Sequence, residues 1–225
     1  MPSLPVLRAV GAEVLAFLLA ATCAGCGIPG TLLCEGCRGG LCPQPLELTT
    51  PGGLAVHAAL RFDSVPARCI RRLKDDGETM LARPLGAALR DVLLGLDAWR
   101  PDLLVVPVPT ARSSFRRRGY RVPELLIRHA GAAPTRALSI AGGADQRGLD
   151  AEERVRNVRG RMRARTSGDG RHAVLVDDVV TTGATFDEAR RALEQAGFRV
   201  VAGIALAATA RHSERTGDAS ETRSK

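Results

Sequence analysis

Aromatic side chains are scarce in this sequence, and lysine is almost missing. Phe, Trp and Tyr make up 3% of the 225 residues, so the core has to be built from Ala, Val, Leu and Ile. So few rings leave little material for the stacking platforms on which single-stranded nucleic acids bind. Lysine occurs only at Lys74 and Lys225, although Lys and Arg together number 32. The net charge of +8 is therefore an arginine charge, which by itself favours a polyanionic partner only weakly.

The arginines gather in two clusters that are more informative than the total charge. Neither cluster contains an acidic residue, so each is either an anion-binding surface or a solvated segment. The first comprises Arg112, Arg116, Arg117, Arg118 and Arg121, and the second comprises Arg154, Arg156, Arg159, Arg161, Arg163 and Arg165.

No hydrophobic run in the sequence is long enough to cross a membrane. The stretch Val6 to Thr22 resembles a secretion signal, because Arg8 precedes an apolar segment from Val14 to Ala21. Glu13 interrupts that stretch, and the cysteines that follow it fit a metal site better than a lipidation site. We therefore expect an amphipathic helix packed on the cysteine segment.

Four of the six cysteines form two CxxC pairs, which is metal-site spacing. Two thiolates three positions apart across a tight turn can reach one tetrahedral zinc ion. Structural Zn²⁺ is favoured over a redox dithiol, because nothing nearby resembles a thioredoxin fold. Cys42 is a candidate spare ligand, and Cys69 is expected to be a small core residue. Cysteines used for metal binding indicate a reducing compartment, the cytoplasm. The predicted zinc ligands are Cys23, Cys26, Cys34 and Cys37.

Strand and helix patterns alternate along most of the chain, which predicts an α/β fold with an open, mainly parallel sheet flanked by helices. We expect an N-terminal amphipathic and cysteine-rich module over residues 1–50, a main domain over 54–210 and a disordered tail over 211–225. The polar segment 142–171 is predicted to be a long functional or disordered loop. The predicted strands are 54–62, 103–108, 138–141, 173–180 and 198–208, and the predicted helices are 67–73, 78–96, 123–130 and 184–196.

The sequence AVLVDDVVTTGAT, at residues 173–185, carries the strongest chemical signal. Its apolar run ends at Asp177 and Asp178, so both carboxylates emerge at the carboxyl end of a strand, where open α/β sheets bind ligands. The following residues turn directly into a helix, and their amides and hydroxyls converge at the positive end of its dipole, which suits a phosphate. These residues are Thr181, Thr182, Gly183, Ala184 and Thr185.

A phosphate cradle beside two carboxylates fits a ligand that has a phosphate and vicinal hydroxyls, such as a ribose 5-phosphate. A Walker loop would need a lysine after the glycine, and a Rossmann fingerprint would need three spaced glycines, whereas Gly183 stands alone here. The plainer alternative is a strand end followed by a capped helix without a ligand. The two adjacent carboxylates after a wholly apolar run favour the ligand site.

This segment resembles the 5-phosphoribosyl-pyrophosphate (PRPP) binding signature of type I phosphoribosyltransferases at all 13 positions. Around it, VVPVPTARSSFRRRGY at 105–120, QRGLDAEERVRNVRG at 146–160 and the CxxC pairs are similar to the ComF family, named for a bacterial competence locus. The likeness extends from Cys23 to Ala208. One departure is that Arg121 and Val122 stand where family members commonly have Asn and Gln.

The resemblance implies a type I phosphoribosyltransferase fold with a small N-terminal zinc module. In such a fold Asp177 and Asp178 would contact the ribose hydroxyls and act catalytically, by stabilising positive charge on the sugar as pyrophosphate leaves. The turn from Thr181 to Thr185 would bind the 5-phosphate.

The same resemblance implies where the leaving group lies. Val108, Pro109 and Arg112 would form the pyrophosphate side of the site, with Mg²⁺ bridging the pyrophosphate oxygens. Arg154 and Asn157 would belong to a mobile hood that closes over the site and excludes water.

We therefore predict a PRPP-binding phosphoribosyltransferase-like protein that transfers a 5-phosphoribosyl group to an acceptor and releases pyrophosphate. The sequence identifies neither the acceptor nor the oligomeric state, and a homo-oligomer is compatible with it. The alternative is a non-catalytic competence or DNA-uptake accessory protein that retains the fold and binds nucleic acid or a protein partner. Steeply salt-dependent DNA binding would support that alternative.

Overall fold

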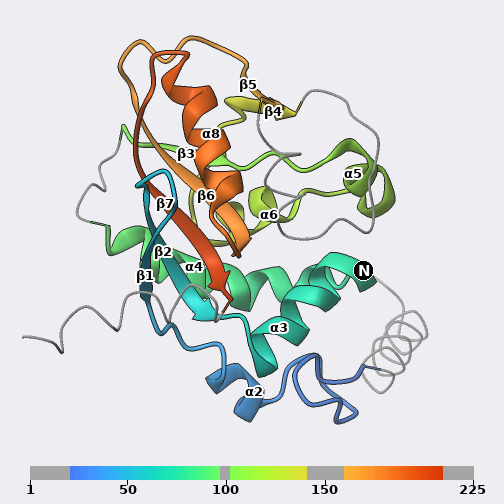
Figure 1. The fold of residues 1–225 in the computed structure, drawn as a ribbon. Helices are drawn as coiled ribbons and strands as arrows, with labels where there is room; N and C mark the ends of the chain where they lie inside the picture. Colours follow the sequence, from blue (N-terminus) through green and yellow to red (C-terminus); the bar gives the residue numbers. More distant parts are fainter. Residues whose placement is uncertain (1–20, 97–101, 141–159, 210–225) are drawn as a thin grey trace, which may run out of the picture.

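The computed structural model describes residues 21–96, 102–140 and 160–209, and its centre is a five-stranded sheet (Figure 1). Four strands are parallel, and the strand at one edge is antiparallel to its neighbour. The carboxyl ends of the parallel strands therefore share one edge of the sheet. In spatial order the strands are β1 (Leu46–Thr49), β2 (Ala55–Arg61), β7 (Arg199–Ala208), β6 (His172–Val180) and β3 (Leu104–Pro107).

Both faces of the sheet are covered. Val174 and Val176 of β6 belong to the core on one face, and Ala173 and Leu175 belong to the core on the other. Side chains alternate across a strand, so a central parallel strand needs apolar residues at every position. The first face is packed by α3 (Ser64–Arg71), α4 (Ala82–Leu94) and α6 (Val122–His129), and the second by α8 (Ala184–Glu194) with a hairpin of β4 (Leu138–Ile140) and β5 (Met162–Ala164).

The remaining helices are single turns or little more. The cysteine segment contains α2 (Glu35–Gly39) and lies beside α3 (Figure 1), and its Cys23 and Cys37 are buried in the same core cluster as Ile70 of α3. Between α3 and α4 the chain forms a π-helical turn, η1, and a 3-10 turn, η2. Their bounds are η1 (Arg72–Asp76) and η2 (Thr79–Leu81), and α5 (Arg112–Arg118) follows β3.

Most of the predicted elements are confirmed with ends shifted by a few residues. The predicted helix over 78–96 begins only at Ala82, after η2, so that Pro84 falls in its first turn, where a missing N–H costs no hydrogen bond. The pattern missed four short elements, namely β1, β5, α2 and α5. Segments of three to seven residues are too short to show a period of their own.

Two of these short strands change the predicted organisation. β1 lies within the predicted N-terminal module, yet it pairs with β2 and forms an edge of the main sheet. β5 lies within the predicted loop 142–171 and pairs antiparallel with β4. The predicted N-terminal helix up to residue 20, the hood residues Arg154 and Asn157, and the predicted tail fall outside the described residues. Within 21–96, 102–140 and 160–209, no helix combines the length and hydrophobicity that a membrane span requires.

Candidate functional site

Asp177 and Asp178 are the sixth and seventh of the nine residues of β6 and lie toward the carboxyl edge of the sheet. Asp178 is 8% exposed and Asp177 is half-buried, and the Asp178 N–H donates to Asp177 Oδ1 at 2.8 Å. Burial, and then the neighbouring Asp178 carboxylate, raise the pKa of Asp177 well above its usual range. The two adjacent carboxyl groups can accept hydrogen bonds from hydroxyl groups, and a positive charge beside them would favour the ionised form of both.

Lys74 completes this acidic pair, and sequence reasoning missed it. Its Nζ lies 2.8 Å from Asp178 Oδ2. The lysine comes from η1, which the chain brings over the carboxyl end of β6 from far away in the sequence. One signal was available, because lysine is so rare in this arginine-rich chain.

The predicted phosphate-binding turn follows β6 directly. Thr181 and Thr182 are exposed, whereas Ala184 and Thr185 at the start of α8 are half-buried. Gly183 is the N-cap of α8 and has a φ of 78°, a conformation that favours glycine. The Ala184 N–H donates to the Thr182 hydroxyl at 3.4 Å. The first N–H groups of a helix have no partner within the helix, which is the property by which helix N-termini bind phosphate.

The turn between β1 and β2 forms a wall against this helix start. The Thr50 hydroxyl donates to Asp187 Oδ1, and the Gly52 N–H donates to Asp187 Oδ2 at 2.9 Å. A Cβ atom on Gly183 would lie 2.7 Å from Thr50 Cγ2, so the two segments are in close contact. A pocket of about 590 Å³ opens here, lined by residues that include Thr182, Ala184 and Asp187.

A second, arginine-lined cleft of about 160 Å³ lies at the carboxyl end of β3. Val108, Pro109 and Arg112, the predicted pyrophosphate side, all line it. The Val108 N–H donates to the Val176 carbonyl at 2.8 Å, so the cleft lies beside the residue that precedes the acidic pair. Three further arginines line the same cleft, and they are Arg121, Arg136 and Arg165.

The buried Glu124 organises these arginines. Its carboxylate accepts from Arg136 Nε at 2.9 Å and Nη2 at 2.6 Å, and it lies 3.7 Å from Arg121 Nε. The Arg121 guanidinium also stacks on Phe115, with its Cζ 4.1 Å from the ring centroid. Arg121 therefore has a structural role at the start of α6. The resembled family commonly has Asn at this position.

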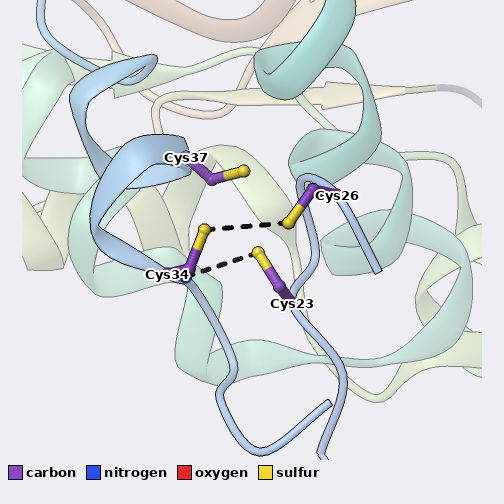
Figure 2. A group of neighbouring side chains, drawn as sticks. All are labelled: Cys23, Cys26, Cys34 and Cys37. Atoms are coloured by element: carbon purple, nitrogen blue, oxygen red, sulfur yellow. Dashed lines mark hydrogen bonds between the residues drawn. The ribbon is translucent and has the colours of Figure 1, made fainter. Parts of the chain in front are cut away.

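The four predicted zinc ligands form one cluster (Figure 2). The Sγ atoms of Cys23, Cys26, Cys34 and Cys37 all lie within 4.8 Å of one another, and the Cys26 to Cys34 distance is 3.7 Å. A Zn–S bond of about 2.3 Å in a tetrahedron requires S to S distances of about 3.8 Å, so the cluster fits the ion. Cys42 is not part of the cluster, and Cys69 is fully buried in the core, as predicted.

The electrostatics of the cluster also favour a cation. Burial raises the pKa of Cys23, but N–H donors of Cys34, Cys26 and Gly25 outweigh it and lower that pKa to about 6. Burial and the surrounding sulfurs raise the pKa of Cys37. Four thiolates this close repel one another unless a positive ion lies between them.

The fold and the site define the class of this protein. A mainly parallel sheet, an acidic pair at the end of β6 and a glycine-containing turn into α8 make an α/β domain of the type I phosphoribosyltransferase fold. The family model "Phosphoribosyl transferase domain" matches residues 120–225.

Within this class, the chain belongs to the ComF family of phosphoribosyltransferase-like proteins. It is 32% identical over 198 residues to the DNA utilization protein YhgH of Escherichia coli O6:H1, with 80% of each chain covered. Competence protein F of Haemophilus influenzae is 31% identical over 134 residues, which cover 54% of this chain and 56% of that protein. Among solved structures, the adenine phosphoribosyltransferase of Rhodothermus marinus covers 92% of both chains at 17% identity, with a TM-score of 0.39.

Proposed function

We propose that this protein binds PRPP at the carboxyl edge of its sheet and transfers the 5-phosphoribosyl group to an acceptor. The observation that carries the proposal is the placement of three kinds of ligand-binding group on two neighbouring strands. β6 supplies the acidic pair and leads into the phosphate turn, and β3 leads into the arginine-lined cleft. PRPP carries a phosphate, a ribose diol and a pyrophosphate, so each part of the ligand has a matching group.

Each part of the site has a role in this proposal. The turn from Thr181 to Thr185 binds the 5-phosphate, and Asp177 and Asp178 accept hydrogen bonds from the ribose hydroxyls. As the bond between C1 and the pyrophosphate oxygen breaks, an electron pair of the acceptor forms the new bond to C1, and the acceptor proton passes to solvent. The acidic pair stabilises the positive charge on the sugar, and the cleft with Val108, Pro109 and Arg112 receives the leaving group. Mg²⁺ on the pyrophosphate oxygens would offset their charge.

The cysteine cluster is proposed to hold a structural zinc ion. All four positions are filled by thiolates, so no coordination position remains for a substrate or a catalytic water. Free thiols held for a metal ion suit a reducing compartment, which supports a cytoplasmic location.

Titration calorimetry of the zinc-loaded protein tests the main proposal. PRPP with Mg²⁺ is compared with ribose 5-phosphate alone and with pyrophosphate alone. We expect PRPP to bind more tightly than either fragment and only with Mg²⁺, and pyrophosphate release then identifies acceptors. Absence of PRPP binding by folded, zinc-loaded protein would overturn the proposal.

Nucleic-acid binding is the second candidate function. The relatives are named DNA utilization protein and Competence protein F, and Arg116 and Arg117 of α5 are exposed. Binding through such arginines would release counterions, so affinity for a DNA oligonucleotide should fall steeply between low and moderate salt. Absent or salt-insensitive binding would exclude this function.

A further inference from the structure

The π-helical turn η1 carries the one lysine found in the described part of the chain. The sequence has 32 basic residues and only two lysines, and Lys74 lies directly against the proposed PRPP site. π-Helical turns are rare and frequently mark functional positions. Gly77, with a φ of 77°, ends this turn and lets the chain reverse into η2.

The turn is held in place from the side of α5. The Tyr120 hydroxyl donates to the Leu73 carbonyl, immediately before Lys74. Arg118 and Arg117 approach Asp75 Oδ1 at 3.5 and 3.9 Å. Both neighbours of Lys74 in the chain therefore contact α5 or the residues just after it, Leu73 through its backbone and Asp75 through its side chain.

The opposite side of the turn is held by the cysteine segment. Arg72 pairs with Glu78 and donates from Nη1 to the Thr22 carbonyl at 3.1 Å. Thr22 directly precedes the first cysteine of the cluster. The turn is therefore braced on two sides, which fixes the backbone from which the Lys74 side chain reaches Asp178.

The ion pair is only partly shielded from water. The Lys74 side chain is 29% exposed and that of Asp178 is 11% exposed. An ammonium has three N–H donors and Asp178 uses one of them, so the group can hold the carboxylate and still face the site. It is also more compact than a guanidinium, which leaves room for a ligand in a narrow site.

We propose that Lys74 is a positioning residue of the PRPP site: its ammonium orients the Asp178 carboxylate toward the ribose hydroxyls and offsets the repulsion between the two aspartates. This inference rests on the proposed function. Among the described residues, the charged groups that contact one another here are Lys74 from η1 and the aspartates of β6, and Asp75 of the same turn pairs with Arg117 and Arg118.

The positive charge of Lys74 also opposes the rise in the pKa of Asp177. Losing that charge should raise the pKa further, so Asp177 would ionise only at higher pH. Binding that needs both carboxylates ionised would then shift its pH dependence upward.

The experiment compares wild type with Lys74→Met, Lys74→Arg and the control Arg90→Met, in which an exposed cation of α4 is removed. PRPP with Mg²⁺ and pyrophosphate alone are titrated across a pH series, and folding is checked by circular dichroism and zinc content. For Lys74→Met we expect PRPP affinity at neutral pH to fall by about tenfold and its pH profile to move up by about one unit. Lys74→Arg keeps the positive charge, so we expect the pH dependence of its PRPP affinity to match that of wild type. Pyrophosphate affinity should change by no more than about twofold in each variant.

The outcomes separate this inference from the proposed function. If wild type binds no PRPP, the proposed function fails. If wild type binds PRPP and Lys74→Met matches Arg90→Met in affinity and pH profile, Lys74 has no positioning role. An equal loss of PRPP and pyrophosphate binding with an unchanged profile would indicate a general structural effect and also overturn the inference. If Lys74→Met does not fold, Lys74→Gln takes the place of Lys74→Met in every comparison. That variant removes the charge and keeps a hydrogen-bond donor.

Discussion

Replacing Gly183 by alanine should destabilise the protein through two separable effects. The φ of 78° places the residue in the left-handed region, which costs an L-residue about 1–2 kcal/mol. The new Cβ would also lie 2.7 Å from Thr50 Cγ2 and 2.9 Å from Thr50 Cβ, and relieving such overpacking costs about 1–3 kcal/mol. We therefore expect the free energy of unfolding to fall by about 2–5 kcal/mol.

Gly131→Ala is the matched control for the backbone effect. Gly131 has a φ of 86°, and a Cβ there would meet no atom within 4 Å. Gly131→Ala should therefore lower the free energy of unfolding by only about 1–2 kcal/mol. Urea unfolding measures both variants, and calorimetry measures PRPP binding by Gly183→Ala, which should weaken because the shift displaces the phosphate turn. If Gly183→Ala cost no more than Gly131→Ala, the close contact with Thr50 would be wrong.

Three further predictions concern the acidic pair, the cysteine cluster and Glu188. Changing Asp177 and Asp178 together to Asn should abolish tight PRPP binding while thermal unfolding still shows a folded protein; unchanged affinity would refute the site assignment. Cys34→Ser should remove zinc from the purified protein and make the N-terminal segment protease-sensitive, and constant zinc by elemental analysis would contradict four-thiolate binding. Burial raises the pKa of Glu188, but hydrogen bonds from Arg191 and backbone N–H groups outweigh it and lower the pKa below its ordinary 4.5. Glu188→Gln should thus cost about 1–3 kcal/mol at neutral pH in urea titrations, a difference that begins to shrink as pH falls below about 4.5 and is lost once pH falls below the lowered pKa of the folded protein. A pH-independent cost would show that ionisation of Glu188 is not the cause.

Glu188 joins the hairpin of β4 and β5 to helix α8. Its carboxylate accepts from the Met162 N–H at 3.0 Å and from Arg191 Nη2 at 2.7 Å. Met162 begins β5, so this buried carboxylate connects the hairpin to α8, the helix that starts at the phosphate turn. Glu188 and Arg191 of this network also line the larger pocket.

Local sequence was sufficient for the parts of the site that are contiguous in the chain. The apolar run of β6 predicted a strand buried on both faces, because successive side chains point to opposite sides of the sheet. Asp177, Asp178 and the turn to Thr185 follow that strand within a few residues, so their relation to one another depends only on a strand end and a helix start. The two CxxC pairs likewise predicted a metal cluster, because the two thiols of each pair are separated by a single turn of chain.

Only the tertiary structure decided which distant residues join this site. Lys74 meets Asp178, and Thr50 meets Asp187, across long stretches of chain that the sheet order and helix packing bring together. Glu124 of α6 is likewise brought together with cleft arginines that come from α5, from the start of α6 and from the segments before β4 and after β5. A sequence pattern reports the period of one element and the chemistry of neighbouring residues. A contact between elements leaves no such period, because it is set by strand order, register and the packing of a shared core.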